Sequence, residues 1–253
     1  MSVIRMLIIV VAMSQCACDA TKEQDSKLSS DADLKEETSM NTLSEEEKND
    51  GWMLLFDGKS TQGWRGFNKT SISDNWIVEN GTLKSEVSSE HSGDIVFGEQ
   101  EFGNFDLRLD WKIAQGGNSG IMYHVLEGET YGGPHVTGPE YQLIDDLGYE
   151  HPLEDWQKTG NDYAMYSNPE RNVKPHSEWN TARILFTDEM VSYWLNGQMT
   201  VSFVPWSEDW HDRKNAGKWK DYPDYGMAKK GLICLQDHGS DIWFRNIKIK
   251  VVD

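Results

Sequence analysis

The 253-residue chain has few cysteines, no excess of basic residues and no long apolar run. It has three cysteines, and Cys234 is the only one after residue 18, so no disulfide can link parts of the main body. The formal charge is −18 and no basic stripe is present, which excludes the surface that a nucleic-acid partner needs. The N-terminal apolar run, 6–13, is well short of the roughly 20 residues of a membrane-spanning helix.

The first residues have the pattern of a bacterial export signal. Arg5 precedes the apolar run 6–13, which ends at small and polar residues. Cys18 follows the small Ala17 and is the expected lipid anchor, with Cys16 as the competing choice. We therefore expect residues 1–17 to be a signal peptide cleaved before Cys18, and the mature chain to be held on a bacterial membrane, in the periplasm or at the cell surface.

Residues 18–50 have the composition of a disordered acidic tether. The stretch 19–50 has no aromatic residue and holds eleven acids against four lysines. Such a segment cannot bury enough apolar area to offset the entropy of ordering it. Within it, Ser44 followed by Glu47 fits a capping box at the start of a short helix.

Residues 51–253 are long enough for one substantial core and are expected to form a single domain. Apolar and polar residues alternate along 105–113, as in a half-buried strand. Asn-Gly pairs at 80–81 and 196–197 predict tight hairpin turns. Residues 148–174 show no sustained period and predict a long loop, and 206–225 is polar, aromatic and poor in helix signals. The sequence predicts an all-β sandwich.

Residues 116–146 carry much of the unusual chemistry of the chain. They predict two strands, 119–126 and 140–146, joined by a glycine-rich loop. Because successive side chains of a strand alternate between faces, Glu140, Gln142 and Asp146 are predicted to share one face. Two carboxylates and an amide can lie on a solvated face of a sheet, but the apolar opposite face and flanks of the strand make a cleft floor equally plausible.

The C-terminal strands supply a second polar group. Gln236 and His238 share a face at the end of a strand whose Cys234 is expected to be buried. Phe244 and Ile247 should both be buried, although residues three apart on a regular strand point to opposite faces. A bulge at 245–246 would bring both side chains to the same face.

A family resemblance rests on long motifs that cover essentially the whole body. These are, in order, GWMLLFDGKSTQGW, FGNFDLRLDWKI, GGNSGIMYH, GPEYQLIDD, EWNTARI, YWLNG and GLICLQDHGSDIWFRNIKIK. They resemble the 3-keto-disaccharide hydrolase family. The resemblance implies a concanavalin A-like jelly-roll β-sandwich with its site on the concave face, in a secreted or lipid-anchored bacterial protein. It also implies hydrolysis of glycosides that carry a ketone at C3 of the sugar.

A C3 ketone acidifies the proton on C2, so a base can remove it, the enolate can expel the group on C1, and water can then add. This route needs a base, an acid and donors aimed at the enolate. With the resemblance, it gives Glu140 and His238 as the expected proton-transfer residues. The expected substrate-binding residues are Asn118, His124, Gln142, Asp146, Tyr163, Gln236, Trp243 and Arg245.

His124 stands where the family commonly has an arginine. It could therefore transfer protons or help to ligate a divalent metal with Glu140, Asp146 and His238. No short-spaced ligand motif supports that set, so no cofactor is assigned.

Two other functions remain open. Jelly-roll sandwiches often act as conventional glycoside hydrolases with two carboxylates, and the eleven Trp residues also suit a non-catalytic carbohydrate-binding module. The enzyme hypothesis requires that residues 116–146 and 236–245 meet in space.

Overall fold

The computed structural model describes residues 40–87 and 93–253. The predicted signal peptide, the lipidation site and most of the predicted tether lie outside the described residues. The compact unit runs from Asn41 to Asp253, so it starts ten residues before the predicted boundary. Asn41 explains the earlier start, because its N–H donates to Asn246 Oδ1 at 2.7 Å and its own Oδ1 accepts from the Asn246 N–H at 2.8 Å.

The first helix confirms the predicted capping box. Helix α2 spans Glu45–Asn49, and the Ser44 side chain accepts from the Glu47 N–H while the Glu47 carboxylate accepts from the Ser44 N–H. Lys248 of the last strand forms an ion pair with Glu47. These contacts hold residues 41–50 against the body.

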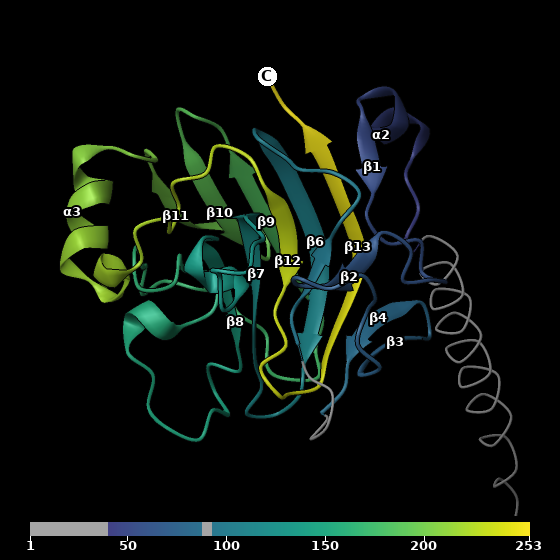
Figure 1. The fold of residues 1–253 in the computed structure, drawn as a ribbon. Coiled ribbons are helices and arrows are strands. Elements are labelled where there is room, and N and C mark those ends of the chain that lie inside the picture. Colours follow the sequence, from purple (N-terminus) through teal and green to yellow (C-terminus); the bar gives the residue numbers. More distant parts are fainter. Residues whose placement is uncertain (1–39, 88–92) are drawn as a thin grey trace, which may run out of the picture. The chain divides into compact units, whose positions relative to one another are not determined.

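The body consists of two antiparallel sheets, as predicted for a jelly-roll sandwich (Figure 1). The eight-stranded sheet has the order β11-β10-β9-β6-β13-β4-β3, with β1 paired to β13. Its strands are β1 (Trp52–Leu54), β3 (Trp76–Glu79), β4 (Thr82–Ser85), β6 (Phe105–Ile113), β9 (Asn180–Phe186), β10 (Val191–Leu195), β11 (Gln198–Phe203) and β13 (Ile242–Val251).

The five-stranded sheet has the order β2-β5-β12-β7-β8. Its strands are β2 (Trp64–Gly66), β5 (Ile95–Phe97), β7 (Asn118–Val125), β8 (Glu140–Ile144) and β12 (Leu232–Leu235). The strands β7 and β8 are those predicted for 116–146, although β8 ends two residues earlier than expected. The site is built on this sheet.

The main core fills the space between the sheets, and β6 shows why. Its alternate residues Phe105, Leu107, Leu109, Trp111 and Ile113 are each no more than 2% exposed. They pack in one cluster with residues of the other sheet, such as Ile121 and Leu235. The alternation predicted for 105–113 is confirmed.

Local backbone features also follow the sequence. Asn80-Gly81 joins β3 to β4 and Asn196-Gly197 joins β10 to β11, and all four residues have positive φ, as tight hairpin turns require. The register of β13 against β6 shifts between Arg245 and Lys248. The predicted bulge is therefore present.

The prediction for 206–225 was wrong, because this segment contains helix α3 (Glu208–Ala216). Ser207 caps it by accepting from the Trp210 N–H at 3.2 Å. Trp210 is the only apolar residue that this short helix buries, so no apolar period could show in the sequence. Figure 1 shows α3 at one side of the molecule.

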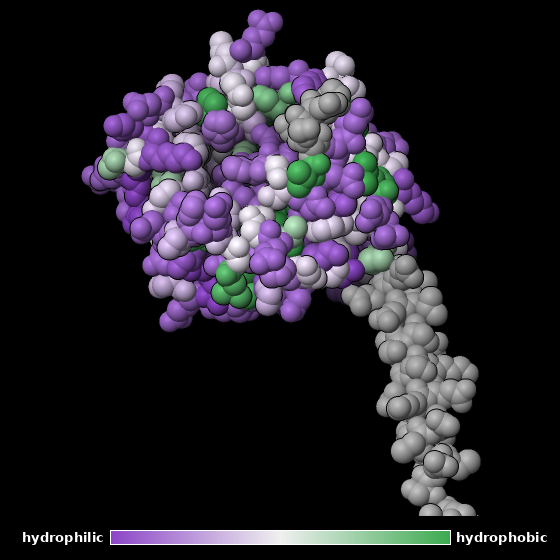
Figure 2. Space-filling view, turned by 90° about the horizontal axis from the view of Figure 1, so that it is seen from below, coloured by the Kyte–Doolittle hydropathy of each residue, from purple (hydrophilic) through white to green (hydrophobic). Residues whose placement is uncertain are grey.

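Three single 3-10 turns complete the fold: η1 (Pro134–Val136), η2 (Asp155–Gln157) and η3 (Lys218–Asp221). Apart from η2, the described part of the 148–174 loop has no regular element, as predicted. None of the helices in the described ranges is long and apolar enough to cross a membrane. The face seen in Figure 2 is mostly hydrophilic, with small scattered apolar spots.

Candidate active site

A polar cavity of about 340 Å³ lies on the five-stranded sheet. Its size is suited to a small ligand. The lining residues come from β7, β8, the segment directly after β12 and four other loops or turns: Asp94, Asn118, His135, Glu140, Gln142, Tyr163, Lys218, Trp219, Gln236, Asp237 and His238. Of the predicted site residues, it brings together Asn118, Glu140, Gln142, Tyr163, Gln236 and His238.

The two distant regions that the enzyme hypothesis requires do meet here. The Gln236 N–H donates to the Gly120 carbonyl at 2.9 Å, and the Ser119 hydroxyl donates to the Gln236 carbonyl at 2.7 Å. The Asn118 N–H donates to Ser240 Oγ at 3.2 Å. These three hydrogen bonds therefore fix the segment after β12 beside the start of β7.

Glu140, the first residue of β8, is 5% exposed and lines the cavity. No hydrogen bond to its carboxyl group comes from the described residues. Burial raises the pKa of Glu140 to about 8, and the nearby charge of Asp94 acts in the same direction, while Lys218 opposes it. Glu140 is therefore mainly protonated at neutral pH and can donate a proton.

Gly120 makes room for the Glu140 carboxyl group. A Cβ atom at position 120 would lie 2.9 Å from Glu140 Cδ and closer still to its Oε1. Any side chain at this position would have to displace the acid. Gly120 is paired with Gln142, so the acid lies across the neighbouring strand.

Three amide side chains line the cavity together with this acid. Gln142 Nε2 donates to Asn118 Oδ1 at 3.0 Å, which orients both side chains. Gln236 Oε1 is buried and has no hydrogen-bond partner among the described residues. A buried amide oxygen without a partner is costly, and a sugar hydroxyl donating to it would satisfy it.

The acidic side of the cavity contains Asp94 and Asp237. Asp94 Oδ1 accepts from the Asp237 N–H at 2.9 Å. Burial raises the pKa of Asp94 to about 6, with a further contribution from the Asp237 charge. Asp237 is a structural carboxylate, since it accepts from Asn75 Nδ2, the Gly93 N–H and the Gly239 N–H.

Another part of the lining is basic and aromatic. Lys218 Nζ lies 4.2 Å from the ring centroid of Tyr163 and 4.8 Å from that of Trp219. Trp219 is 1% exposed and stacks on Tyr225 with a centroid separation of 4.0 Å. Burial lowers the pKa of His135, and the Lys218 charge lowers it further.

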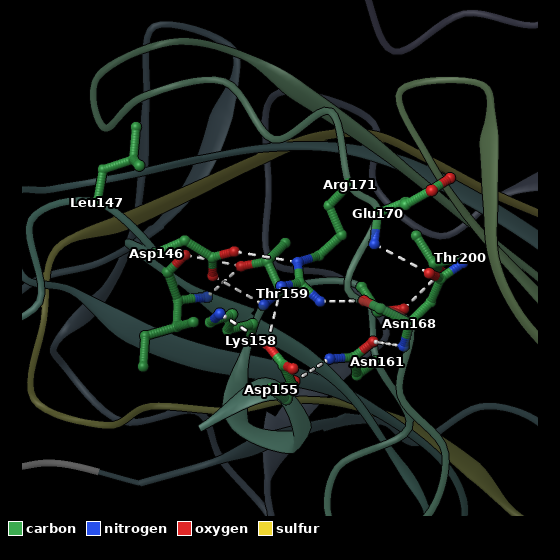
Figure 3. Close-up of polar contacts among 12 residues, drawn as sticks. Asp146, Leu147, Asp155, Lys158, Thr159, Asn161, Asn168, Glu170, Arg171 and Thr200 are labelled. Carbon is green, nitrogen blue, oxygen red and sulfur yellow. Dashed lines mark hydrogen bonds and ion pairs between the residues drawn. The ribbon is translucent and has the colours of Figure 1, made fainter. Parts of the chain in front are cut away.

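The long loop that carries Tyr163 is held by the network in Figure 3. Arg171 Nε lies 3.4 Å from Asp146 Oδ2, and both side chains are less than a tenth exposed. Asp146 Oδ1 accepts from the Thr159 N–H at 2.9 Å. Further along, Asn161 Nδ2 donates to the Asp155 carbonyl at 2.5 Å. Asp146 thus helps to hold this loop in place without lining the cavity.

Asp146 is therefore one of four predicted site residues that do not line the cavity. It follows the end of β8, and its carboxylate binds Arg171 and Thr159. His124 is 1% exposed, with its Nε2 2.9 Å from the Gly103 carbonyl and its ring 4.3 Å from that of Phe186. A φ of 53° at His124, where β7 and β12 shift register, turns the ring into the core.

Trp243 and Arg245 are the other two predicted site residues that do not line the cavity. Both lie on β13, which belongs to the eight-stranded sheet. Lys112 Nζ lies 4.6 Å from the Trp243 ring centroid, and Arg245 Nε lies 3.2 Å from Asp110 Oδ2. Alternation gives the face of a strand but not the sheet that the strand joins, so it could not show that these two residues lie outside the cavity.

The hypothetical metal-ligand set does not assemble in the described part of the chain. His124 points into the core and Asp146 binds Arg171, whereas Glu140 and His238 line the cavity. No group of three or more His, Cys, Asp or Glu residues within 40–87 and 93–253 has the arrangement of a metal site.

Sequence reasoning missed five lining residues: Asp94, His135, Lys218, Trp219 and Asp237. All five lie on loops or single turns, where no strand parity indicates a direction. The Trp-rich segment 206–225 was a signal for Lys218 and Trp219, since buried aromatic residues in a polar segment indicate docking on the body.

Comparisons with known proteins show which proteins this chain resembles. A 3-keto-disaccharide hydrolase of Bacteroides thetaiotaomicron is 34% identical over 233 residues, which cover 81% of this chain and 79% of that protein. A crystal structure of a candidate glycosyl hydrolase from Parabacteroides distasonis has 46% identity and a TM-score of 0.80, covering 85% of this chain and 100% of the other. A second such structure from the same organism has 25% identity and a TM-score of 0.61, covering 79% and 99%.

The family model for the 3-keto-alpha-glucoside-1,2-lyase-like domain matches residues 51–250. This match takes in both sheets and every residue that lines the cavity. The chain belongs to the 3-keto-alpha-glucoside-1,2-lyase-like domain family.

Proposed function

We propose that this protein cleaves the glycosidic bond of sugars that carry a ketone at C3, such as 3-keto-glycosides or 3-keto-disaccharides. The observation that carries the proposal is Glu140, a buried acid that faces a polar cavity and has a pKa raised to about 8. The family match and the named relative from Bacteroides thetaiotaomicron support the substrate class.

The reaction proceeds in two stages. A base takes the proton on C2 of the 3-keto sugar, and the electron pair of the C2–H bond enters the enolate. The C1–O bond then breaks, the leaving oxygen takes a proton from the enzyme, and a C1–C2 double bond conjugated to the ketone remains. Water adds to this enone, with its hydroxyl at C1 and a proton at C2, so that the net reaction is hydrolysis.

Each step has a group in the cavity. Glu140, protonated at neutral pH, donates to the leaving oxygen, and His238 at the exposed edge takes the C2 proton. Asn118, Gln142 and Gln236 bind sugar hydroxyls, and Tyr163 offers a ring face for stacking.

The test uses one 3-keto glycoside and its unoxidised parent, each with the purified protein and with or without a chelator. We expect aglycone release from the keto sugar alone. In the same assay, His238→Ala should abolish release and Asp94→Asn should retain it. The reverse result would make Asp94 the base.

A conventional glycoside hydrolase is the second candidate, because Glu140 and Asp94 place two carboxyl groups with different pKa values on one cavity. Release of aglycone from the unoxidised glycoside at a comparable rate would favour it. Binding of both sugars without release of either would favour a carbohydrate-binding module.

We also propose that the chain is exported and lipid-anchored through Cys18. The support is the signal-like sequence of residues 1–17. Mass spectrometry of the mature N-terminus would identify the lipidated cysteine, and an unmodified chain that retains Met1 would contradict the proposal.

A further inference from the structure

The negative charge of an enolate would be disfavoured by the acidic residues that line the cavity. The carboxylates of Asp94 and Asp237 line it, and the whole chain carries a formal charge of −18. Negative charge that develops on a substrate oxygen would be repelled in these surroundings. Catalysis of this kind normally requires a fixed positive group or hydrogen-bond donor aimed at that oxygen.

Lys218 is the one lysine or arginine among the described residues that line the cavity. No ion pair or side-chain hydrogen bond joins its ammonium group to another described residue. Its Nζ instead lies over the ring faces of Tyr163 and Trp219, at 4.2 and 4.8 Å from the centroids. Cation–π contacts hold an ammonium group in place while its N–H donors stay available to a ligand.

The position of Lys218 is tied to that of Glu140 by backbone and indole bonds. The Tyr163 N–H donates to the Glu140 carbonyl at 3.0 Å, and Trp219 Nε1 donates to the Tyr163 carbonyl at 3.1 Å. Trp219 is itself fixed by its stacking on Tyr225. The turn η3 therefore presents Lys218 at a set position relative to the acid.

We propose that Lys218 is a catalytic residue that donates a hydrogen bond from its ammonium group to the C3 oxygen and stabilises the enolate. This assignment rests on the proposed function. In the step, the C2–H electron pair moves into the C2–C3 bond and the carbonyl π pair moves onto the C3 oxygen. Lys218 keeps its protons throughout and forms no covalent bond with the substrate.

The alternative use of a cation here is to assist the leaving group at C1. The two roles respond differently to leaving-group ability. A good leaving group such as 2,4-dinitrophenolate needs no help at C1, but its release still requires the C2 proton to be removed. Stabilisation of the negative charge on the C3 oxygen should therefore affect the rate with good and with poor leaving groups.

The experiment compares Lys218→Met with Lys220→Met, a control in the same turn whose lysine is exposed and outside the cavity. Substrates are 3-keto glucosides with 2,4-dinitrophenol and with methanol as leaving groups. We expect Lys218→Met to lose roughly 100-fold or more in kcat with both substrates, with a smaller change in KM. Lys220→Met should match the parent, and Lys218→Arg should recover part of the loss.

A second readout follows the enolate itself. In D₂O the parent should exchange the C2 hydrogen of the 3-keto sugar product, and Lys218→Met should exchange it at least tenfold more slowly. Thermal unfolding of each variant separates this loss from misfolding.

Recovery of Lys218→Met by the dinitrophenyl substrate, a change confined to KM, or unchanged exchange would each overturn the assignment. If the parent itself fails on every 3-keto glucoside, the proposed function fails instead. The parent and variant reactions therefore separate the two failures.

Discussion

Glu140 concentrates the chemistry of the site in one side chain. It is buried at the start of β8, its carboxyl group has no hydrogen-bond partner among the described residues, and it faces a cavity whose size suits a small ligand. Burial favours the neutral form of a carboxyl group because the ionised form loses its hydration. The same residue in a solvated loop would be ionised at neutral pH and could not act as an acid.

The first prediction concerns Glu140→Gln. The variant keeps the shape of the side chain but carries no transferable proton, so kcat/KM on an alkyl 3-keto glucoside should fall by roughly 100-fold to 10,000-fold. In the parent, activity should fall as the pH rises through about 8, where Glu140 loses its proton. Initial rates between pH 5 and 10 measure this fall in activity.

The activity of Glu140→Gln should show no fall near pH 8. A substrate whose leaving group needs no proton should restore much of the rate of this variant. A variant that keeps both the rate and the parent's pH profile would show that Glu140 is not the acid.

At the scale of elements, β7 and β8 work as a pair. The glycine at position 120 of β7 leaves the space into which the acid of β8 folds. The loop behind β8 is fixed by Asp146 and Arg171, and it positions Tyr163 on the cavity wall. Both arrangements lead to predictions that need no change to a residue lining the cavity.

Gly120→Ala should displace the Glu140 carboxyl group. A misplacement of about 1 Å can cost roughly 100-fold in rate, and inserting a methyl group here should cost about 1 to 3 kcal/mol of stability. Gly132→Ala is the matched control, because nothing lies within 4 Å of a Cβ atom at that position. Rates and urea midpoints are compared for both variants, and equal rates would contradict the space-making role of Gly120.

Arg171→Met should loosen the 148–174 loop. The variant leaves the Asp146 carboxylate without its buried partner, and breaking a buried ion pair in this way costs about 3 to 5 kcal/mol. The control is Lys158→Met, whose partner Asp155 is mostly exposed, so the loss should be below about 1 kcal/mol. Denaturant unfolding and limited proteolysis of the loop measure the two effects, and an equal loss in both variants would contradict the prediction.

At the scale of the whole molecule, the raised pKa of Glu140 links stability to pH. The folded protein keeps this proton up to a pH of about 8, whereas an unfolded chain releases it above the ordinary value of 4.5. Between these values the unfolded state binds fewer protons, so the stability that this group confers at low pH is lost as the pH rises, by about 1.4 kcal/mol per pH unit. Glu140→Gln removes that dependence.

The stability of Glu140→Gln relative to the parent should therefore improve by up to about 3 kcal/mol between pH 6 and pH 8. Urea unfolding at the two pH values measures this difference. The pKa shift of Asp94 is present in both proteins and cancels in the comparison. Glu150→Gln, at an exposed position, should show no such change, and a parallel pH dependence in all three proteins would contradict the prediction.

Much of the fold could be read from the sequence because its signals are local. Alternation along β6, the Asn-Gly turns, the β13 bulge and the Ser44 capping box depend on neighbouring residues. The site was harder to predict, since parity on β8 correctly joined Glu140 to Gln142 but could not place β13 in the other sheet. Asp94 and Lys218 reach the cavity from irregular segments, whose direction depends on the packing of the whole molecule.

The absent side chain at position 120 also gives a way to sort related chains without solving their structures. A relative with glutamate at the position of Glu140 and glycine at the position of Gly120 has both halves of the arrangement, the acid and the space that receives it. A relative that keeps the acid but has a larger residue at 120 must hold its carboxyl group elsewhere. This two-residue signature therefore selects which family members should share the acid chemistry, before any of them is purified.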